Sequence, residues 1–102
     1  MVTYLFNSTG EWICFKKGKH LFNTEGEWIG WFPWDDSEAV DTDGNYLGTI
    51  YRNRFIYFNN RPYRGYPGYP GYHDYPGYPG YPGFAGYLPL PANARDVILK
   101  KK

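Results

Sequence analysis

The sequence predicts an all-β protein: a small, shallow barrel of about four pseudo-symmetric β-hairpin repeats, followed by a polyproline II-like, low-complexity tract. Three observations predict this fold. The chain has 102 residues, which is the length of one domain. A motif typical of β-hairpins recurs through the first sixty residues. Beyond them, aromatic residues fall on every third position, among most of the prolines of the chain.

An internal repeat organises the first predicted domain, residues 1–61. The stretch 5–13 (LFNSTGEWI) returns as 21–29 (LFNTEGEWI), and a looser copy covers 39–47 (AVDTDGNYL). Each copy has two apolar residues, Asn or Asp, two polar residues, Gly, one polar residue and an apolar run. Because Asn and Asp hydrogen-bond their own backbone and Gly adopts positive φ, each copy predicts two short strands joined by a polar turn.

A partial fourth copy begins at Arg54, but no second strand follows it directly. An unpaired strand would leave an exposed sheet edge, so we expect a segment near the C-terminus to supply the missing partner. The candidates are 87–90 and 96–99, and we favour 96–99 because Pro89 limits the other to a sheet edge. Residues 88–102 are therefore the third predicted segment, which ends in three lysines.

The second strand of each copy carries matching residues at matching positions. Large aromatic residues come two places after the glycine, aliphatic residues three places after it, and small residues four places after it. Because strand side chains alternate between faces, both faces of these strands are apolar and need cover. The small residues predict a point where backbones or rings converge. The three sets are Trp12, Trp28 and Tyr46; Ile13, Ile29 and Leu47; and Cys14, Gly30 and Gly48.

Residues 62–87 form the second predicted segment, in which aromatic residues and glycines both recur with a period of three. Polyproline II has three residues per turn, so this spacing places the aromatic residues along one candidate binding ridge. Three interpretations stay open: a flexible low-complexity tail, a ridge docked on the aromatic face of this chain or a neighbour, and a short collagen-like triple helix. The ridge consists of Tyr63, Tyr66, Tyr69, Tyr72, Tyr75, Tyr78 and Tyr81.

The repeat resembles the bacterial four-fold β-flower family over residues 3–60. The resemblance rests on 26–32 (GEWIGWF) and on 41–48 (DTDGNYLG), which are similar to the paired motifs of that family. It implies a shallow barrel of four hairpins around an apolar centre, and the family has no established activity. An analogy to tubby-like and scramblase-like barrels is one of fold alone. The chain departs from the family in its Gly-Tyr-Pro tract and in Cys14, which stands where later repeats have glycine.

Few residues suggest catalysis. Ser8 and Ser37 lack the context of a nucleophile elbow. Cys14 and His20 on neighbouring strands could form a thiolate pair, but Cys14 occupies the small-residue position, and we favour a packing role. The sequence therefore predicts neither an enzyme nor a cofactor.

Charged residues do not indicate a metal or nucleic-acid site either. Asp35, Asp36 and Glu38 form an acidic cluster, which we interpret as a solvated connector rather than a weak divalent-cation site. The stretch 41–45 lacks the spacing of a calcium loop. A net charge of +1 does not favour a nucleic-acid partner.

The aromatic content of 23% is the best functional clue. We assign Trp31 and Trp34 to an exposed binding surface and Trp12 and Trp28 mainly to the core. The predicted function is non-catalytic binding or assembly through this surface and the tyrosine ridge, with another copy or another protein as partner. The alternative is a peripheral membrane module, because Trp and Tyr favour lipid interfaces. No apolar run reaches the roughly 20 residues of a membrane-spanning helix, so we expect a cytoplasmic location.

Overall fold

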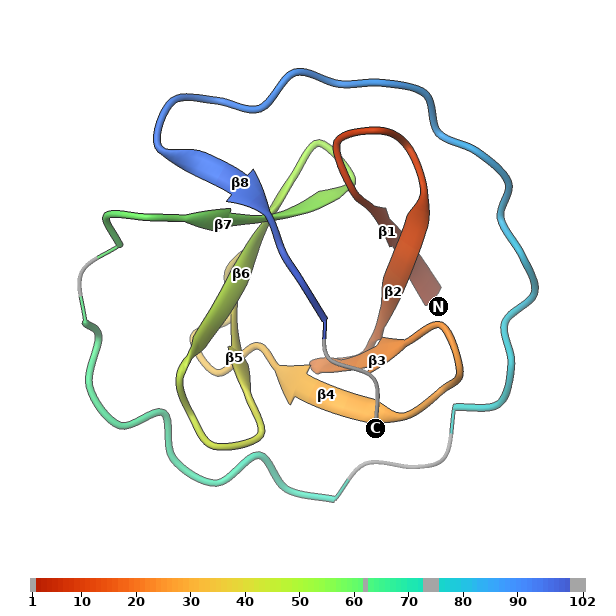
Figure 1. The fold of residues 1–102 in the computed structure, drawn as a ribbon. Helices are drawn as coiled ribbons and strands as arrows, with labels where there is room; N and C mark the ends of the chain where they lie inside the picture. The colour runs from red at the N-terminus through yellow and green to blue at the C-terminus, as the bar shows by residue number, and fades with distance from the viewer. Residues whose placement is uncertain (1, 62, 73–75, 100–102) are drawn as a thin grey trace.

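The computed structural model describes residues 2–61, 63–72 and 76–99, and these form an all-β fold. Seven strands make a closed barrel, and an eighth strand is added to the seventh (Figure 1). The prediction of a small β-barrel is thus confirmed. The strands are β1 (Val2–Phe6), β2 (Trp12–Lys17), β3 (His20–Asn23), β4 (Trp28–Trp31), β5 (Glu38–Asp41), β6 (Tyr46–Tyr51), β7 (Arg54–Phe58) and β8 (Ala94–Asp96).

Consecutive strands pair antiparallel around the whole barrel, and one parallel contact closes it. Phe6 of β1 pairs with Arg54 of β7, and the Phe6 N–H donates to the Asn53 carbonyl at 3.0 Å. Further along β7, its strand partner is β8, where Tyr57 pairs with Arg95. Among the described residues there is no helix, and so none that is long and apolar enough to cross a membrane.

The first three hairpins are β1–β2, β3–β4 and β5–β6, and their turns contain the hydrogen bonds that their sequences predict. In the first, the Asn7 N–H donates to the Glu11 carbonyl at 2.9 Å, and the Gly10 N–H donates to the Asn7 carbonyl at 3.0 Å. Gly10 has φ +93°, a conformation that glycine adopts without steric cost. The corresponding donor and acceptor pairs are Asn23 with Glu27, Gly26 with Asn23, Asp41 with Asn45, and Gly44 with Asp41.

A β-bulge follows each of these turns at the same place. Leu5 pairs with Cys14 and Phe6 pairs with Trp12, so Ile13 has no partner across the ladder. The pairing skips Ile29 and Leu47 in the same way. Strict alternation of side chains along the strand predicts that Ile13 and Cys14 point to opposite faces. Both pack in the interior cluster instead, because the extra residue of the bulge interrupts this alternation.

The small residues after each bulge lie where the barrel is most crowded, as predicted. A Cβ on Gly30 would lie 2.2 Å from the Val40 carbonyl oxygen. A Cβ on Gly48 would lie 2.8 Å from both a Phe55 ring carbon and a Val97 methyl carbon. Cys14, the matching residue of the first hairpin, is fully buried. These positions therefore limit side-chain size because the barrel interior is narrow.

The fourth hairpin is formed by β7 and β8, whose connection spans residues 59–93. The Asn59 N–H donates to the Asn93 carbonyl at 2.8 Å, where the chain enters and leaves this connection. Of the predicted strand 96–99 only Asp96 lies in a strand, and 87–90 is not a strand. The added strand begins earlier than predicted because Ala94 and Arg95 pair with the second half of β7.

We call residues 61–91 the encircling loop, because its described parts, 61, 63–72 and 76–91, follow the circumference of the barrel between β7 and β8 (Figure 1). The tract therefore connects two paired strands, as expected from a strand supplied by the C-terminal segment. Its seven described glycines, from Gly65 to Gly86, have φ between +71° and +93°. Polyproline II needs φ near −75° at every residue, so the loop is not a regular polyproline II helix.

The encircling loop contacts the outer face of the first hairpin, where Tyr78 and Tyr81 lie beside Trp12. Aromatic rings on the outer face of β1–β4 form a series that we call the outer aromatic row. Phe15 and Phe22 are cross-strand partners whose rings stack at 5.5 Å, and both are buried. Trp12 lies beside Phe15 at 6.3 Å. The prediction that these strands need cover on both faces is confirmed, since the interior cluster fills one face and this row the other.

Residues 97–99, which follow β8, cover one end of the barrel interior (Figure 1). Val97 is buried in the interior cluster, and Leu99 packs against it. The C-terminal segment therefore stabilises the fold through apolar contacts as well as through strand pairing.

We predict that Gly30→Ala destabilises the barrel by about 1–3 kcal/mol, because the added methyl group would overlap the Val40 carbonyl oxygen. Thermal and urea unfolding of the purified variant measure this change. Cys14→Ala is the matched control, since the equivalent position of the first hairpin already holds a side chain, and we expect a smaller effect. Equal stability of G30A and the wild-type chain would contradict the packing described here.

Candidate functional site

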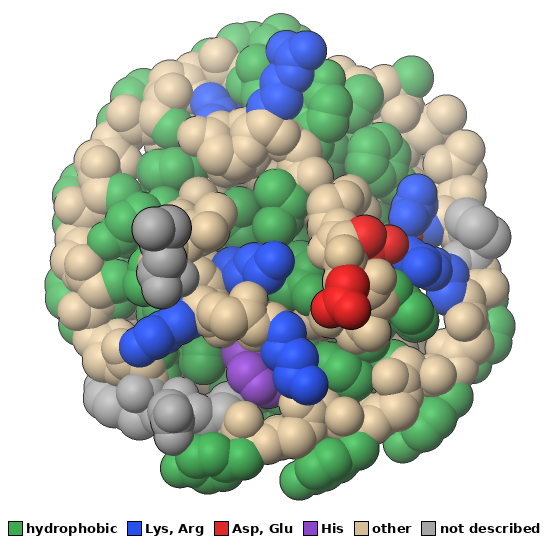
Figure 2. Space-filling view, turned by 180° about the vertical axis from the view of Figure 1, so that it is seen from behind, with side chains coloured by type: hydrophobic (Ala, Val, Ile, Leu, Met, Phe, Trp, Pro, Cys, Tyr) green, Lys and Arg blue, Asp and Glu red, His purple; other side chains and the backbone are tan. Residues whose placement is uncertain are grey.

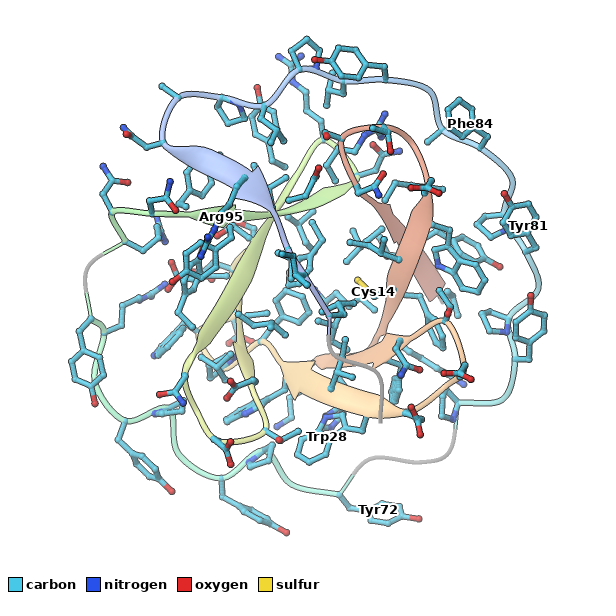
Figure 3. The ribbon with its side chains drawn as sticks, in the orientation of Figure 1. Cys14, Trp28, Tyr72, Tyr81, Phe84 and Arg95 are labelled. Carbon is cyan, nitrogen blue, oxygen red and sulfur yellow. The ribbon has the colours of Figure 1, made fainter. Side chains whose placement is uncertain are left out.

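The exposed large aromatic side chains of the described residues lie on the encircling loop, and we call them the aromatic rim. Each is 64–89% exposed. Figure 3 shows Tyr72 and Phe84 pointing away from the barrel. Tyr75 of the predicted ridge lies outside the described residues. The rim consists of Tyr63, Tyr66, Tyr69, Tyr72, Tyr78, Tyr81, Phe84 and Tyr87.

The period of three in the sequence produces this outward orientation. Aromatic residues take the outer position of each triplet, whereas the prolines between them are half-buried. Pro67, for example, lies 3.3 Å from the position that a Cβ on Gly44 would take. Tyr78 and Tyr81 of the predicted ridge contact the barrel, since their rings lie 6.0 and 6.1 Å from the Trp12 ring.

Ion pairs attach the first part of the encircling loop to β5. Glu38 opens this strand, and its side chain is only 3% exposed. Arg61 donates to its Oε2 atom, and the Arg64 Nη1 atom lies 3.2 Å from its Oε1 atom. The same Arg64 nitrogen donates to the Asp36 Oδ2 atom at 2.8 Å. The interpretation of this acidic cluster as a solvated connector is wrong for Glu38.

The electrostatic environment of Asp36 favours its charged form. Partial burial acts to raise the pKa of Asp36, but the hydrogen bonds from Arg64 and from the Glu38 N–H outweigh it. With the nearby charges of Arg64 and Arg61, they hold the pKa of Asp36 below its ordinary value. The Arg64 pKa is raised by the same pairing, first through its hydrogen bond to Asp36.

Backbone and side-chain hydrogen bonds attach the last part of the loop to β1 and its turn. The Tyr4 hydroxyl donates to the Pro79 carbonyl at 2.7 Å. The Ala85 N–H donates to the Gly10 carbonyl at 2.9 Å, and the Leu88 N–H donates to the Ser8 carbonyl at 2.8 Å. These bonds give the loop fixed contacts with the first hairpin.

Arg54 holds the loop close to the closure between β1 and β7. Its side chain is buried, and its Nη2 atom donates to the Gly86 carbonyl at 2.6 Å. A Cβ on Gly10 would lie 2.4 Å from the Gly86 nitrogen, so the two glycine backbones are in direct contact. Ser8 donates both its N–H and its hydroxyl to the Asp96 carboxylate, each at 2.7 Å. Ser8 therefore has a structural role, in agreement with the absence of a nucleophile context in the sequence.

Neither tryptophan assigned to an exposed surface is exposed. Trp31 is only 5% exposed and lies in β4, so its assignment to a binding surface is wrong. Trp34 is half-buried, and the Arg64 guanidinium lies 4.3 Å above the centre of its ring. Arg64 of the encircling loop covers Trp34. The neighbours of Trp31, by contrast, include His20 of β3 and Lys19, both from the barrel.

Cys14 and His20 do not form a reactive pair. Cys14 is fully buried in the interior cluster, and burial raises the pKa of its thiol, so the reactive thiolate is disfavoured. His20 packs on the outer aromatic row beside Phe22 and Trp28. In the described part of the chain, no three His, Cys, Asp or Glu residues are grouped as metal ligands.

A shallow depression of about 540 Å³ lies on the face opposite the C-terminal segment. Figure 2 shows charged side chains of both signs around an apolar centre on this face. Two lysines and two aspartates line the depression around Phe32, namely Lys16, Lys19, Asp35 and Asp36. The Lys16 ammonium lies 4.6 Å from the centre of the Phe32 ring. Lysine and aspartate here balance each other, so the depression does not select a charged ligand of one sign.

Comparison with known proteins returned no match: no family model matches the chain, and no curated protein or solved structure matches it. The rim, its attachments and its chemistry are therefore the basis for a functional interpretation.

We predict that Glu38→Gln lowers the free energy of unfolding by about 1–2 kcal/mol, because a neutral amide loses the ion pairs with Arg61 and Arg64. Both guanidinium groups are about one third exposed, which keeps the loss below that of a fully buried pair. Urea unfolding measures the change, and faster amide exchange at residues 61–66 would locate it. Glu25→Gln, at an exposed turn position, is the control and should leave both unchanged.

We also predict an acid-dependent contribution from Asp36. Its pKa is lower in the folded than in the unfolded chain, so its carboxylate stabilises the fold at neutral pH. This contribution is lost as the pH falls below the ordinary aspartate pKa of about 3.9. Asp36→Asn should therefore be less stable than the wild-type chain at pH 7, and the difference should vanish in acid. A difference that is constant with pH would show that the charge of Asp36 does not act in this way.

Proposed function

We propose that this chain is a non-catalytic binding and assembly module that acts through the aromatic rim. One observation carries the proposal: eight large aromatic side chains stand exposed on a loop that is attached to a barrel. Many large apolar side chains exposed on one segment of a small domain indicate an interaction site. Tyrosine suits such a site because it combines apolar contact area with a hydroxyl that hydrogen-bonds.

The attachments of the loop favour binding. Bonds from Tyr4, Arg54 and Arg64 fix its path on the barrel, so partner binding does not have to order the backbone of the loop from a random state. The backbone that carries the rim is thus ordered before a partner binds, which lowers the entropy cost of association.

The distribution of the rim favours a protein partner, and other copies of this chain in particular. The molecule measures 35 × 34 × 25 Å, and the rim follows its circumference (Figure 3). A flat lipid surface would contact one arc of such a rim at a time, whereas neighbouring protein molecules can contact it from several directions. We therefore place self-association before the peripheral membrane role, and the cytoplasm remains the expected location.

We further propose that the four hairpins are copies of one unit and that the chain is related to the four-fold β-flower family. The bond between Asn59 and Asn93 supports this, because it corresponds to the bond between Asn7 and Glu11 in the first hairpin. In this proposal the encircling loop is the greatly lengthened turn of the fourth unit. The family has no established activity, so the relationship would concern the fold alone.

We predict that replacing Tyr63, Tyr66 and Tyr69 together by serine reduces self-association, since the three side chains are at least 84% exposed and lose their apolar contact area. Sedimentation equilibrium over a range of protein concentrations measures the association. The triple phenylalanine variant is the control, and it should associate like the wild-type chain because it keeps the rings.

A wild-type chain that stays monomeric at every concentration would contradict self-association. Co-sedimentation of that monomer with phosphatidylcholine or phosphatidylserine vesicles would instead support the peripheral membrane role. Monomeric behaviour without vesicle binding would remove both.

A further inference from the structure

The aromatic rim also has the properties of a covalent modification site. We propose that its tyrosines are a site of one-electron oxidation, at which the phenols of neighbouring copies couple to dityrosine. This inference rests on the proposed function, because association brings two rims together before the coupling. The chemical class of the co-reactant is a peroxide used by a haem peroxidase.

The tyrosines of the rim and of the barrel differ in access. Tyr63, Tyr66 and Tyr69 are 84–89% exposed, so an oxidant reaches both the hydroxyl and the neighbouring ring carbons. In the barrel, by contrast, the Tyr4 hydroxyl donates to the Pro79 carbonyl, and the Tyr46 hydroxyl lies 2.6 Å from the Thr49 hydroxyl. Both of these barrel residues are half-buried. Oxidation by a bulky catalyst is therefore directed to the rim.

Sulfur does not compete with the rim for the oxidant in the described part of the chain. Cys14 is the only cysteine, and it is fully buried. Burial also disfavours its thiolate, which is the form that oxidants attack. The only methionine of the chain is Met1, which lies outside the described residues.

The spacing of the rim allows rings of two copies to meet. Adjacent tyrosines are three positions apart, so their Cα atoms lie at most roughly 10 Å from each other. The glycine between them leaves a gap, since a Cβ on Gly65 or Gly68 would have no neighbour within 4 Å. A tyrosine of a second copy can enter such a gap and lie beside a tyrosine of the first. Because the same spacing recurs along the rim, many relative positions of two copies bring phenols together.

The reaction balances with a peroxide as oxidant. Each of two tyrosines loses one electron and the proton of its hydroxyl, while the O–O bond of hydrogen peroxide breaks and two water molecules form. The two phenoxyl radicals join through ring carbons next to the hydroxyl, which forms one carbon–carbon bond. The hydrogen on each joined carbon then moves to the oxygen and restores both hydroxyl groups.

The test treats the full chain with a haem peroxidase and hydrogen peroxide at a concentration at which it associates. We expect dityrosine fluorescence, covalent dimers and larger species on a denaturing gel, and cross-linked peptides from residues 61–91. Replacing the eight tyrosines of 63–87 by phenylalanine should abolish all three signals while keeping reversible association, because the rings remain. Tyr51→Phe with Tyr57→Phe, in the barrel, is the matched control and should cross-link like the wild-type chain.

Cross-links that map to the barrel tyrosines, or a yield of covalent dimers equal to that of the phenylalanine variant, would overturn this inference. Reversible association without covalent dimers would remove the cross-linking and leave the proposed function intact. Covalent dimers that need no prior association, and that form equally at all concentrations tested, would contradict the link between assembly and oxidation drawn here.

Discussion

The structure depends on one constraint: the strands of the first two hairpins are apolar on both faces. Leu5, Cys14 and Leu21 fill the barrel interior, while Phe15 and Phe22 belong to the same strands and face the other way. A barrel of this size can bury only one face of its strands within itself. The second face needs another part of the chain, and the encircling loop supplies it.

That requirement explains why a tract rich in glycine and proline lies against a barrel. The loop has no ladder of its own, so it is held by local contacts at intervals: ion pairs at Glu38, a hydroxyl at Tyr4 and a buried guanidinium at Arg54. Its side chains then divide by triplet position between the barrel and the solvent. The side chains that face the solvent form the aromatic rim, and those that face the barrel form the contact with it.

Local chemistry could be predicted from the sequence, and long-range cover could not. The turns at Asn7 and Gly10 follow from residues close in the chain, and so does the small size needed at Gly30 and Gly48. The burial of Trp31 could not be predicted in this way, because it depends on what surrounds β4 in the folded barrel.

The burial and ion pairing of Glu38 could not be predicted from the sequence for a similar reason. Its partners Arg61 and Arg64 lie more than twenty residues further along the chain, and only the path of the loop brings them to β5. The bulges had a possible signal in the repeated pattern itself. An aliphatic residue beside a small one recurs after every turn, and both face the interior.

The length of the connection between β7 and β8 has a consequence for the order of folding. The first seven strands are joined by short links, so their contacts form at a low cost in chain entropy. Pairing of β8 closes a far longer loop and carries the larger entropy cost. The seven-stranded barrel is therefore the early product, and the outer aromatic row stays open to water until the last hairpin forms. A nascent chain would present those rings to chaperones or to other chains during that interval.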